Sequence, residues 1–390
     1  MPALANKTYF NYGGQGPLPD PSLTAISDCW RSIQELGPFT GDVWPLIERT
    51  AASLRQRLGA WLGVPPQRLA FTENVTSGCV LPLWGLPWQQ GDQLLLSDCE
   101  HPGVVAACGE LARREGFSLA TLPVQDLRSN PAATDAAVLE RLEQVLTPRT
   151  RLVVLSHLLW NTGQVMPIAA VAQRLRQHPD QPWLLVDGAQ SLGSLPLGET
   201  GLADAAAADI YACTGHKWCC GPEGLGVVAL SERLLQQGQP TLIGWRSLSH
   251  EGSAASAFHS DARRFEVATS CIPLMAGLNR SLQLLEAEGS ASERLARIQA
   301  GSRRLWEGLQ RIDGFSTLLE GPPPAGLVSF TGDGNPEGAP PATPDAVVKA
   351  LGRQGIWLRS LEDPPCLRAC THITTTEAEI DRLLAALAGL

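Results

Sequence analysis

The chain has 390 residues, of which 44% are hydrophobic and 18% are charged, and its formal net charge is −9. This composition excludes a largely disordered chain, because disordered segments have few apolar residues and a high net charge. The acidic balance and the lack of a basic stripe exclude nucleic-acid binding as a main activity. No apolar run approaches the ~20 residues of a bilayer span and no secretory signal is recognisable, so we expect a cytoplasmic protein without a membrane partner.

The predicted elements begin with an N-terminal arm over 1–19, which contains the glycine-rich stretch 12–17. Apolar β-prone runs then alternate with helical stretches, which is typical of a mostly parallel sheet with helices on both faces. Strands are expected at 68–72, 93–97, 118–123, 151–157, 183–187, 209–214 and 225–230. Helices are expected at 76–86, 101–116, 134–146, 167–178 and 231–237.

The regular alternation of strands and helices ends after residue 260. We expect one long amphipathic helix over 273–311, a strand at 326–331 and a surface loop over 332–343. Thr376 and Glu379 have the spacing of a capping box that starts a C-terminal helix. Since domains average roughly 150 residues, we divide the chain into the arm, a large α/β domain over 20–260 and a small α+β domain over 261–390.

Ten cysteines lie along the chain without a Cys-x-x-Cys pair. In a large chain of this kind we expect small buried hydrophobic residues rather than a disulfide framework. Cys366, Cys370 and His372 lie close in sequence, but their spacing matches no standard zinc pattern and a second ligand pair is lacking. We therefore predict no metal site.

Asp187 and Lys217 each come at or soon after the end of a predicted buried strand. Ligands of open α/β sheets bind outside the carboxyl ends of the strands. An Asp that keeps a ring nitrogen protonated, and a Lys amine with a depressed pKa, are what pyridoxal 5′-phosphate (PLP) requires. Taken alone, Asp187 is equally a metal carboxylate or a helix cap, and Lys217 is more often a solvated charge.

Other polar groups are candidates at the same rim. Thr76 opens a helix whose N–H groups suit a phosphate, or it belongs to an ordinary cap. His101 starts another helix and either stacks on a cofactor ring or is a plain cap residue. Arg359 and Arg368 each have the planar guanidinium that can bind an amino-acid carboxylate through two hydrogen bonds. Taken alone, each is more often an ordinary surface arginine.

Together these motifs resemble the class V aminotransferase family, which includes the cysteine desulfurases and consists of fold-type-I PLP enzymes. The resemblance covers essentially the whole chain and is carried by Val75-Thr76, Glu100-His101, Asn161, Asp187 to Gln190, Thr214 to Lys217 and Arg368. It implies a large domain with a mostly parallel seven-stranded sheet flanked by helices, and a smaller α+β C-terminal domain. It also implies a homodimer with active sites at the subunit interface.

The resemblance further implies roles for single residues. Lys217, Asp187 and His101 would be catalytic: Lys217 would hold the PLP aldehyde, Asp187 the pyridinium nitrogen, and His101 would stack on the ring. Gln190 would hydrogen-bond the phenolic oxygen of the cofactor. The phosphate would be bound by Thr76, Thr214, His216 and, from the neighbouring subunit, Thr269. The substrate would be bound by Arg368, Asn161, Arg359 and Gly14.

Two positions depart from the family pattern. Val75 stands where many relatives have Thr, which removes one phosphate hydroxyl. Desulfurases carry a nucleophilic Cys on a loop between two C-terminal arginine regions, but here Arg359 is followed almost directly by Arg368. No room remains for that loop, and Cys366 does not match the position of the nucleophile.

Within the family, the segments 9–16, 156–164 and 366–370 look most like cyanobacterial L-cysteine/cystine C–S lyases. This likeness implies β-elimination on L-cystine, or on L-cysteine, that yields pyruvate, ammonia and cysteine persulfide or sulfide. The persulfide would supply a sulfur acceptor protein for iron–sulfur cluster assembly. The alternatives are a desulfurase or selenocysteine lyase that yields alanine, an epimerase or aminotransferase that leaves the sulfur bonded, and a non-catalytic sulfur-trafficking scaffold.

Overall fold

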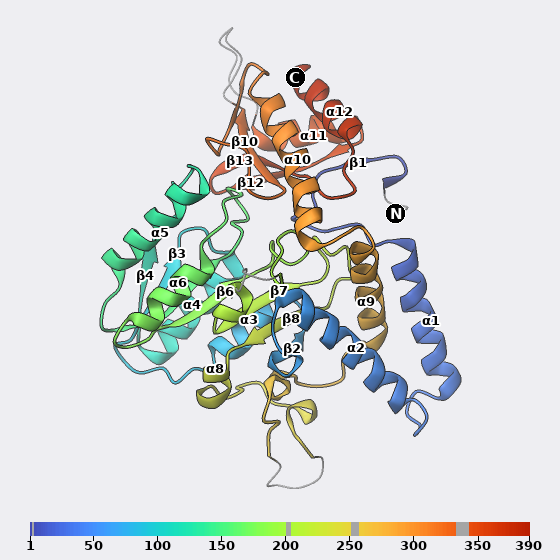
Figure 1. Ribbon diagram of the computed structural model, residues 1–390, viewed down its shortest axis with the longest axis vertical. Helices are drawn as coiled ribbons and strands as arrows, with labels where there is room; N and C mark the ends of the chain where they lie inside the picture. The colour runs from blue at the N-terminus through green and yellow to red at the C-terminus, as the bar shows by residue number, and fades with distance from the viewer. Residues whose placement is uncertain (2–3, 200–203, 251–256, 333–342) are drawn as a thin grey trace.

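The computed structural model describes residues 1, 4–199, 204–250, 257–332 and 343–390 (Figure 1). Its centre is a seven-stranded sheet flanked by helices, and a separate four-stranded antiparallel sheet is built mainly from the C-terminal part. The predicted α/β fold, with a mostly parallel seven-stranded sheet and a smaller C-terminal α+β part, is confirmed.

The central sheet has the strand order β2-β8-β7-β6-β5-β3-β4, and β8 runs antiparallel to both of its neighbours. Each strand lies within one or two residues of its predicted range. Their bounds are β2 Leu69–Thr72, β3 Gln93–Ser97, β4 Ser118–Leu122, β5 Thr150–Ser156, β6 Trp183–Asp187, β7 Ile210–Thr214 and β8 Gly226–Leu230.

Helices cover both faces of this sheet because its inner strands are apolar on both sides. In β5, Val153 and Leu155 belong to one hydrophobic core, and Leu152 and Val154 belong to the other. The first core is shared with α2 Trp44–Leu62, α5 Pro131–Val145, α6 Ile168–Gln177, α7 Asp204–Ala207 and α9 Ile272–Glu286. The second is shared with α3 Val75–Leu83, α4 Pro102–Glu115 and α8 Glu232–Gln237.

The single helix predicted over 273–311 is wrong: the chain forms α9 and then α10, Ala291–Leu309. Gly289 between them has φ +119°, which is accessible to glycine but not to an ordinary helical residue. Ser290 then starts α10 with a capping box that includes Glu293. The apolar periodicity continues across this break, and it therefore hid two helices that pack on different parts of the molecule.

The smaller sheet has the order β12-β13-β10-β9. Its bounds and those of the helices near it are β9 Phe315–Thr317, β10 Leu327–Gly332, β12 Arg359–Glu362, β13 Pro365–Cys370, α11 Pro344–Arg353 and α12 Glu377–Ala388. The predicted capping box of Thr376 and Glu379 is confirmed. Most of the predicted 332–343 loop lies outside the described residues, and the boundary at 260 stays a prediction.

The N-terminal arm forms a third, two-stranded sheet with a segment of the C-terminal part. Its short strand β1, Thr8–Tyr9, pairs in parallel with β11, Ile356–Trp357, and the arm then continues to α1, Asp20–Leu36. Helix α1 packs against α9 at the side of the large sheet (Figure 1). In the described part of the chain, no helix combines the length and apolar character that crossing a membrane requires.

Candidate active site

The carboxyl ends of four neighbouring strands bring polar side chains to one edge of the central sheet. Ser97, Ser156, Asp187 and Thr214 end β3, β5, β6 and β7, and Ser156 lies opposite Asp187 in the register. These strands are parallel, so their ends meet at the same edge. The predicted position of Asp187 at a strand end is confirmed.

A pocket of about 980 Å³ opens next to this edge, between the arm and the smaller sheet. Six residues predicted to belong to the site line it: Gly14, His101, Gln190, Lys217, Arg359 and Arg368. The lining also includes Gly13, Trp160, Asp345, Glu362 and several neighbours that the sequence did not single out. Three distant parts of the chain therefore build one cavity.

Asp187 and Lys217 form the buried ionisable pair of this region. Asp187 is 5% exposed, and its Oδ1 accepts a hydrogen bond from the Ala189 N–H at 2.9 Å. No described residue donates to Oδ2, so one oxygen is available to a cationic N–H. Burial raises the pKa of Asp187, while the Lys217 charge lowers it. Burial likewise lowers the pKa of Lys217 to about 8, against the opposing effect of Asp187. This pair fits the ring nitrogen and aldehyde of PLP.

The start of α3 has the features of an anion site. Asn74 caps it by accepting from the Ser77 N–H at 2.9 Å, and the N–H groups of Val75 and Thr76 find no acceptor among the described residues. Thr214 Oγ1 lies 2.7 Å from His216 Nδ1 at the end of the strand that contacts α3. These groups suit a phosphate, and the half-buried isopropyl group of Val75 adds no hydroxyl.

His101 is the N-cap of α4, and its Nδ1 accepts from the Gly103 N–H at 3.2 Å. Its ring meets Trp160 edge-to-face with 6.0 Å between centroids. Partial burial lowers the pKa of His101, and the Asp187 charge opposes that shift. A neutral imidazole at the pocket wall is compatible with stacking on a cofactor ring, the role that the sequence predicted.

Arg368 is a buried cation, 1% exposed, without a carboxylate partner among the described residues. It donates from Nη1 to the Trp160 carbonyl at 2.8 Å and from Nη2 to Asn11 Oδ1 at 3.3 Å, while Nε has no partner. Burial lowers its pKa. Arg359 stands directly opposite in the register of β12 and β13, so both side chains share one face of the sheet. A carboxylate ligand would compensate the buried charge of Arg368.

Seven predicted residues do not line this pocket: Val75, Thr76, Asn161, Asp187, Thr214, His216 and Thr269. The side chains of Asn161 and Thr269 are occupied or placed elsewhere. The Asn161 amide is already engaged, since it donates to the Asp363 carbonyl at 3.2 Å and accepts from the Thr162 N–H at 2.9 Å. Thr269 is exposed and lines a separate pocket of about 330 Å³ beside Thr72 and Glu73. A contact from the neighbouring subunit, as predicted for Thr269, requires such an exposed position.

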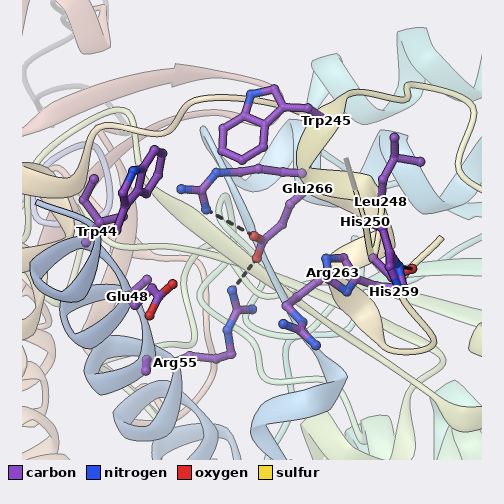
Figure 2. A pocket seen from close by; sticks show the side chains of 14 residues that line it. Trp44, Glu48, Arg55, Trp245, Leu248, His250, His259, Arg263 and Glu266 are labelled. Atoms are coloured by element: carbon purple, nitrogen blue, oxygen red, sulfur yellow. Dashed lines mark hydrogen bonds and ion pairs between the residues drawn. The ribbon is translucent and has the colours of Figure 1, made fainter. Parts of the chain in front are cut away.

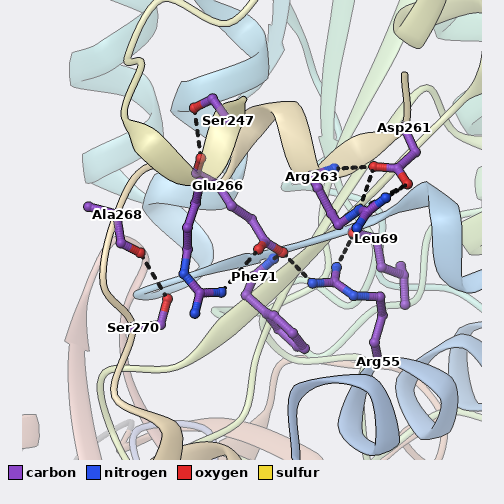
Figure 3. Close-up of polar contacts among 10 residues, drawn as sticks. Arg55, Leu69, Phe71, Ser247, Asp261, Arg263, Glu266, Ala268 and Ser270 are labelled. Carbon is purple, nitrogen blue, oxygen red and sulfur yellow. Dashed lines mark hydrogen bonds and ion pairs between the residues drawn. The ribbon is translucent and has the colours of Figure 1, made fainter. Parts of the chain in front are cut away.

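The segment that leads to Thr269 is fastened to the edge of the central sheet. Glu266, 5% exposed, accepts from Arg55 Nη2 at 2.6 Å and from the Phe71 N–H at 3.0 Å (Figure 3). Arg246 lies 3.8 Å from the other carboxylate oxygen, and all three side chains line a pocket of about 500 Å³ with Trp44 and Trp245 (Figure 2). None of the predicted site residues lines this pocket beside Trp44 and Trp245.

No cysteine lines the main pocket, although Cys370 Sγ accepts a hydrogen bond from the N–H of the lining residue Gly13 at 3.3 Å. All ten lie in described residues, nine of them are buried, and none lines the cavity. Cys271 is the exposed one, so the expectation that most of the cysteines are buried is confirmed. Cys366 is fully buried on β13, and burial raises the pKa of its thiol to about 11. A buried, protonated thiol is a poor nucleophile.

No role was predicted from the sequence for two residues that support the site. Glu100 is buried and accepts hydrogen bonds from Ser97 Oγ at 2.5 Å and from the Ser156 N–H at 2.7 Å, so it connects the ends of β3 and β5. Burial raises the pKa of Glu100 to about 7. Trp160 forms a pocket wall and donates from Nε1 to the Cys99 carbonyl at 3.0 Å. Their positions next to His101 and Asn161 in the sequence were the available signal.

Comparisons with known proteins show the family of the chain. The class-V aminotransferase family model matches residues 46–383. Isopenicillin N epimerase of Amycolatopsis lactamdurans is 30% identical over 100% of this chain and 96% of its own. A probable cysteine desulfurase of Pseudomonas aeruginosa is 30% identical over 87% of this chain and 82% of its own.

Among solved structures, the cystine C–S lyase C-DES in complex with its reaction product cysteine persulfide is 45% identical. It has a TM-score of 0.92 and covers 99% of this chain and 98% of its own. A second C-DES structure, of a lysine-to-alanine mutant, contains glycine covalently linked to the PLP cofactor. The cysteine desulfurase CsdA of Escherichia coli, at 22% identity and a TM-score of 0.83, shares the fold.

Proposed function

The chain belongs to the class-V aminotransferase family of PLP enzymes, and on that premise we propose that it is a carbon–sulfur lyase acting on L-cystine. One observation carries the proposal: the pocket is lined by Lys217 and by Arg368, which has no carboxylate partner among the described residues, and no cysteine lines it. The likeness to C-DES over almost the whole chain supports it. The reaction is L-cystine plus water to pyruvate, ammonia and cysteine persulfide.

The cofactor would be held by residues at the sheet edge. Asp187 would accept from its ring nitrogen, Lys217 would bind its aldehyde, His101 would lie against its ring and Gln190 would donate to its phenolic oxygen. The phosphate would lie at the start of α3, with Thr76, Thr214 and His216 as side-chain donors. When bound, PLP supplies an electron sink that stabilises negative charge at the substrate Cα.

Lys217 has the chemistry of the base in this proposal. Its pKa of about 8 leaves a useful fraction of free amine near neutral pH, so Nζ can take the Cα proton and hold it. Arg368 would bind the substrate carboxylate and so orient the Cα–H bond toward the base. The buried guanidinium would do this at little entropic cost, because packing already fixes it.

Cystine suits the charge pattern of the pocket. It has two carboxylates, and Arg359 and Arg368 place two guanidinium groups on the same face of the smaller sheet. Its leaving group, cysteine persulfide, is a weaker base than the sulfide that would leave from cysteine. The step therefore needs no enzyme thiol, in agreement with the buried Cys366. We propose that a sulfur acceptor protein then takes the persulfide sulfur for iron–sulfur cluster assembly.

We also propose that the protein is a homodimer in which Thr269 reaches the phosphate of the neighbouring subunit. Three large apolar side chains near this region are exposed in the single chain: Leu242 at 54%, Ile243 at 52% and Trp245 at 38%. Residue 246 is paired through its N–H with the Val267 carbonyl, so this apolar segment and the Thr269 segment lie side by side. Association of two copies would cover both together.

Product analysis tests the proposed function. Purified protein is incubated with PLP and either cystine or cysteine, and pyruvate, alanine and sulfane sulfur are quantified. We expect pyruvate and sulfane sulfur in equal amounts from cystine. Alanine in place of pyruvate would identify a desulfurase, and an unchanged carbon–sulfur bond would favour an epimerase or aminotransferase.

Three variants test whether that activity depends on Lys217 and not on Cys366. Lys217→Ala should lower pyruvate formation by at least the roughly 10²- to 10⁴-fold that general-base catalysis supplies. Lys349→Ala, which removes an exposed lysine of α11, is the matched control and should leave the rate unchanged. Cys366→Ala should also turn over cystine near the normal rate, and a complete loss there would restore the desulfurase hypothesis.

A further inference from the structure

Trp218 follows Lys217 directly and is fully buried. Its indole Nε1 donates a hydrogen bond to Oε1 of Gln190 at 2.8 Å. Indole N–H is a donor only, so the group that faces it must be the amide oxygen and cannot be the amide nitrogen. This contact therefore fixes which way the Gln190 amide is turned.

The N-terminal arm fixes the same orientation from the other side. Gln190 Nε2 donates to the Gly13 carbonyl at 2.9 Å, and a carbonyl can only accept. The reversed amide would set two donors against each other at Trp218 and two acceptors against each other at Gly13. An amide nitrogen has two N–H groups, and the second one has no acceptor among the described residues although Gln190 lines the pocket.

Trp218 is itself held firmly. The Trp218 carbonyl lies 3.1 Å from His372 Nε2. The Trp218 ring stacks on the ring of Tyr12, a buried residue of the arm, with 6.4 Å between the ring centroids. Gly326 leaves room for the far edge of the indole, since a Cβ there would come within 2.7 Å of it. The indole N–H of Trp218 therefore keeps its position if the Gln190 amide rotates.

We propose that Trp218 is a positioning residue that keeps an N–H of Gln190 directed at the phenolic oxygen of PLP. This inference rests on the proposed function, because it assumes that the cofactor occupies the pocket. Trp218 acts without touching the cofactor: it makes the reversed amide unfavourable. A donor at the phenolic oxygen stabilises negative charge there, and so weakens the hold of that oxygen on the proton it shares with the lysine-bound nitrogen.

Trp218→Phe tests the inference by removing the N–H while keeping an aromatic ring. Apoprotein is titrated with PLP, and the visible band of the bound cofactor is followed against pH. We expect roughly 3- to 10-fold weaker PLP binding. The pH midpoint of the band should rise by about 0.5 to 1 unit. Trp88→Phe is the matched control, because Trp88 donates to the Leu83 carbonyl at 3.0 Å outside the pocket, and it should change neither quantity.

A double mutant separates positioning from a general packing effect. If Trp218 acts through the amide, Trp218→Phe in a Gln190→Leu background should shift the midpoint no further than Gln190→Leu alone. A further shift of the pH midpoint in the double mutant would overturn the inference. So would a Trp218→Phe protein with the wild-type midpoint and PLP affinity. In both cases the visible band of the wild-type protein would still support the proposed function. A wild-type protein that acquires no visible band would overturn both.

The test does not depend on the phenylalanine variant being folded. Benzothienylalanine at position 218 has the indole shape with sulfur in place of the N–H, and it should raise the midpoint in the same way. A wild-type midpoint in that protein would contradict the inference.

Discussion

The amine of an ordinary lysine is almost entirely protonated at neutral pH, and a protonated amine cannot attack an aldehyde. Burial lowers the pKa of Lys217 to about 8, although Asp187 opposes the shift. About half of the Lys217 amines are therefore neutral near pH 8, compared with roughly 0.4% for an ordinary lysine. On the proposed function, the low pKa of Lys217 would allow cofactor attachment at a pH where an ordinary lysine is almost fully protonated.

This difference predicts the pH dependence of reconstitution. The rate at which apoprotein acquires the visible band of bound PLP should rise with pH, because the neutral amine is the reactive form, and should level off above about pH 8. Stopped-flow absorbance at constant ionic strength measures it. A rate that continues to rise toward about pH 10.4 would mean that Lys217 has an unperturbed pKa.

Residue-level prediction from the sequence succeeded for groups whose place follows from the strand pattern. Asp187 and Lys217 follow buried apolar strands, so parallel topology alone brings them to one edge. Asn161 shows the limit of that reasoning. Its amide is used by the local turn and the Asp363 carbonyl, and no periodicity in the sequence reveals which hydrogen bonds a side chain will make.

At the scale of elements, Glu266 fastens the segment before α9 to the edge strand β2 and to α2. The carboxylate is buried and shared by the Arg55 guanidinium and the Phe71 N–H (Figure 3). Removing the guanidinium leaves a buried charge without its closest partner, which is costly in proteins. The position of Thr269, three residues further on, depends on this attachment.

Arg55→Leu should therefore lower the free energy of unfolding by about 3–5 kcal/mol, measured by urea denaturation. Arg31→Leu is the control, because Arg31 pairs with Asp28 at the surface, where the two side chains are 65% and 59% exposed. This substitution should change the free energy of unfolding by less than about 0.5 kcal/mol. Equal effects of the two substitutions would show that the Glu266 attachment contributes no special stability.

The strands were predictable from the sequence and some helices were not. Strands of the central sheet are short apolar runs buried on both faces, and this signal is local. Helices α1 and α2 were not predicted, and α9 and α10 were merged. The break at Gly289 depends on one backbone angle and a cap, while the leucine periodicity on either side looks continuous.

At the scale of the whole molecule, the pocket needs parts that lie far apart in the sequence. Gly13 of the arm, Lys217 of the large sheet and Arg368 of the smaller sheet meet in one cavity. Sequence patterns predicted each part but not how closely they approach. A Cβ on Gly13 would lie 3.0 Å from Gln190 and 3.1 Å from Arg368, so the arm approaches both side chains so closely that a side chain larger than that of glycine would crowd them.

The proposed homodimer makes a prediction that one chain alone cannot satisfy. Mixed dimers of a Lys217→Ala chain and a Thr269→Val chain contain one site with both Lys217 and a Thr269 from the partner. That site should bind PLP with wild-type affinity, whereas the Thr269→Val homodimer should bind it more weakly, by the roughly 1.5–3 kcal/mol of a hydrogen bond to a charged group. Affinity titration of separately tagged, co-purified dimers measures this. Mixed dimers no better than the Thr269→Val homodimer would contradict a contact between subunits.

The most direct test of the account is to locate the cofactor in the chain. Protein incubated with PLP is reduced with borohydride, which fixes a lysine-bound cofactor in place, and the digested peptides are mapped by mass spectrometry. We expect a pyridoxyl group on Lys217 and none on Lys7 or Lys349. A modification confined to another lysine, or no modification in protein that forms pyruvate from cystine, would contradict it.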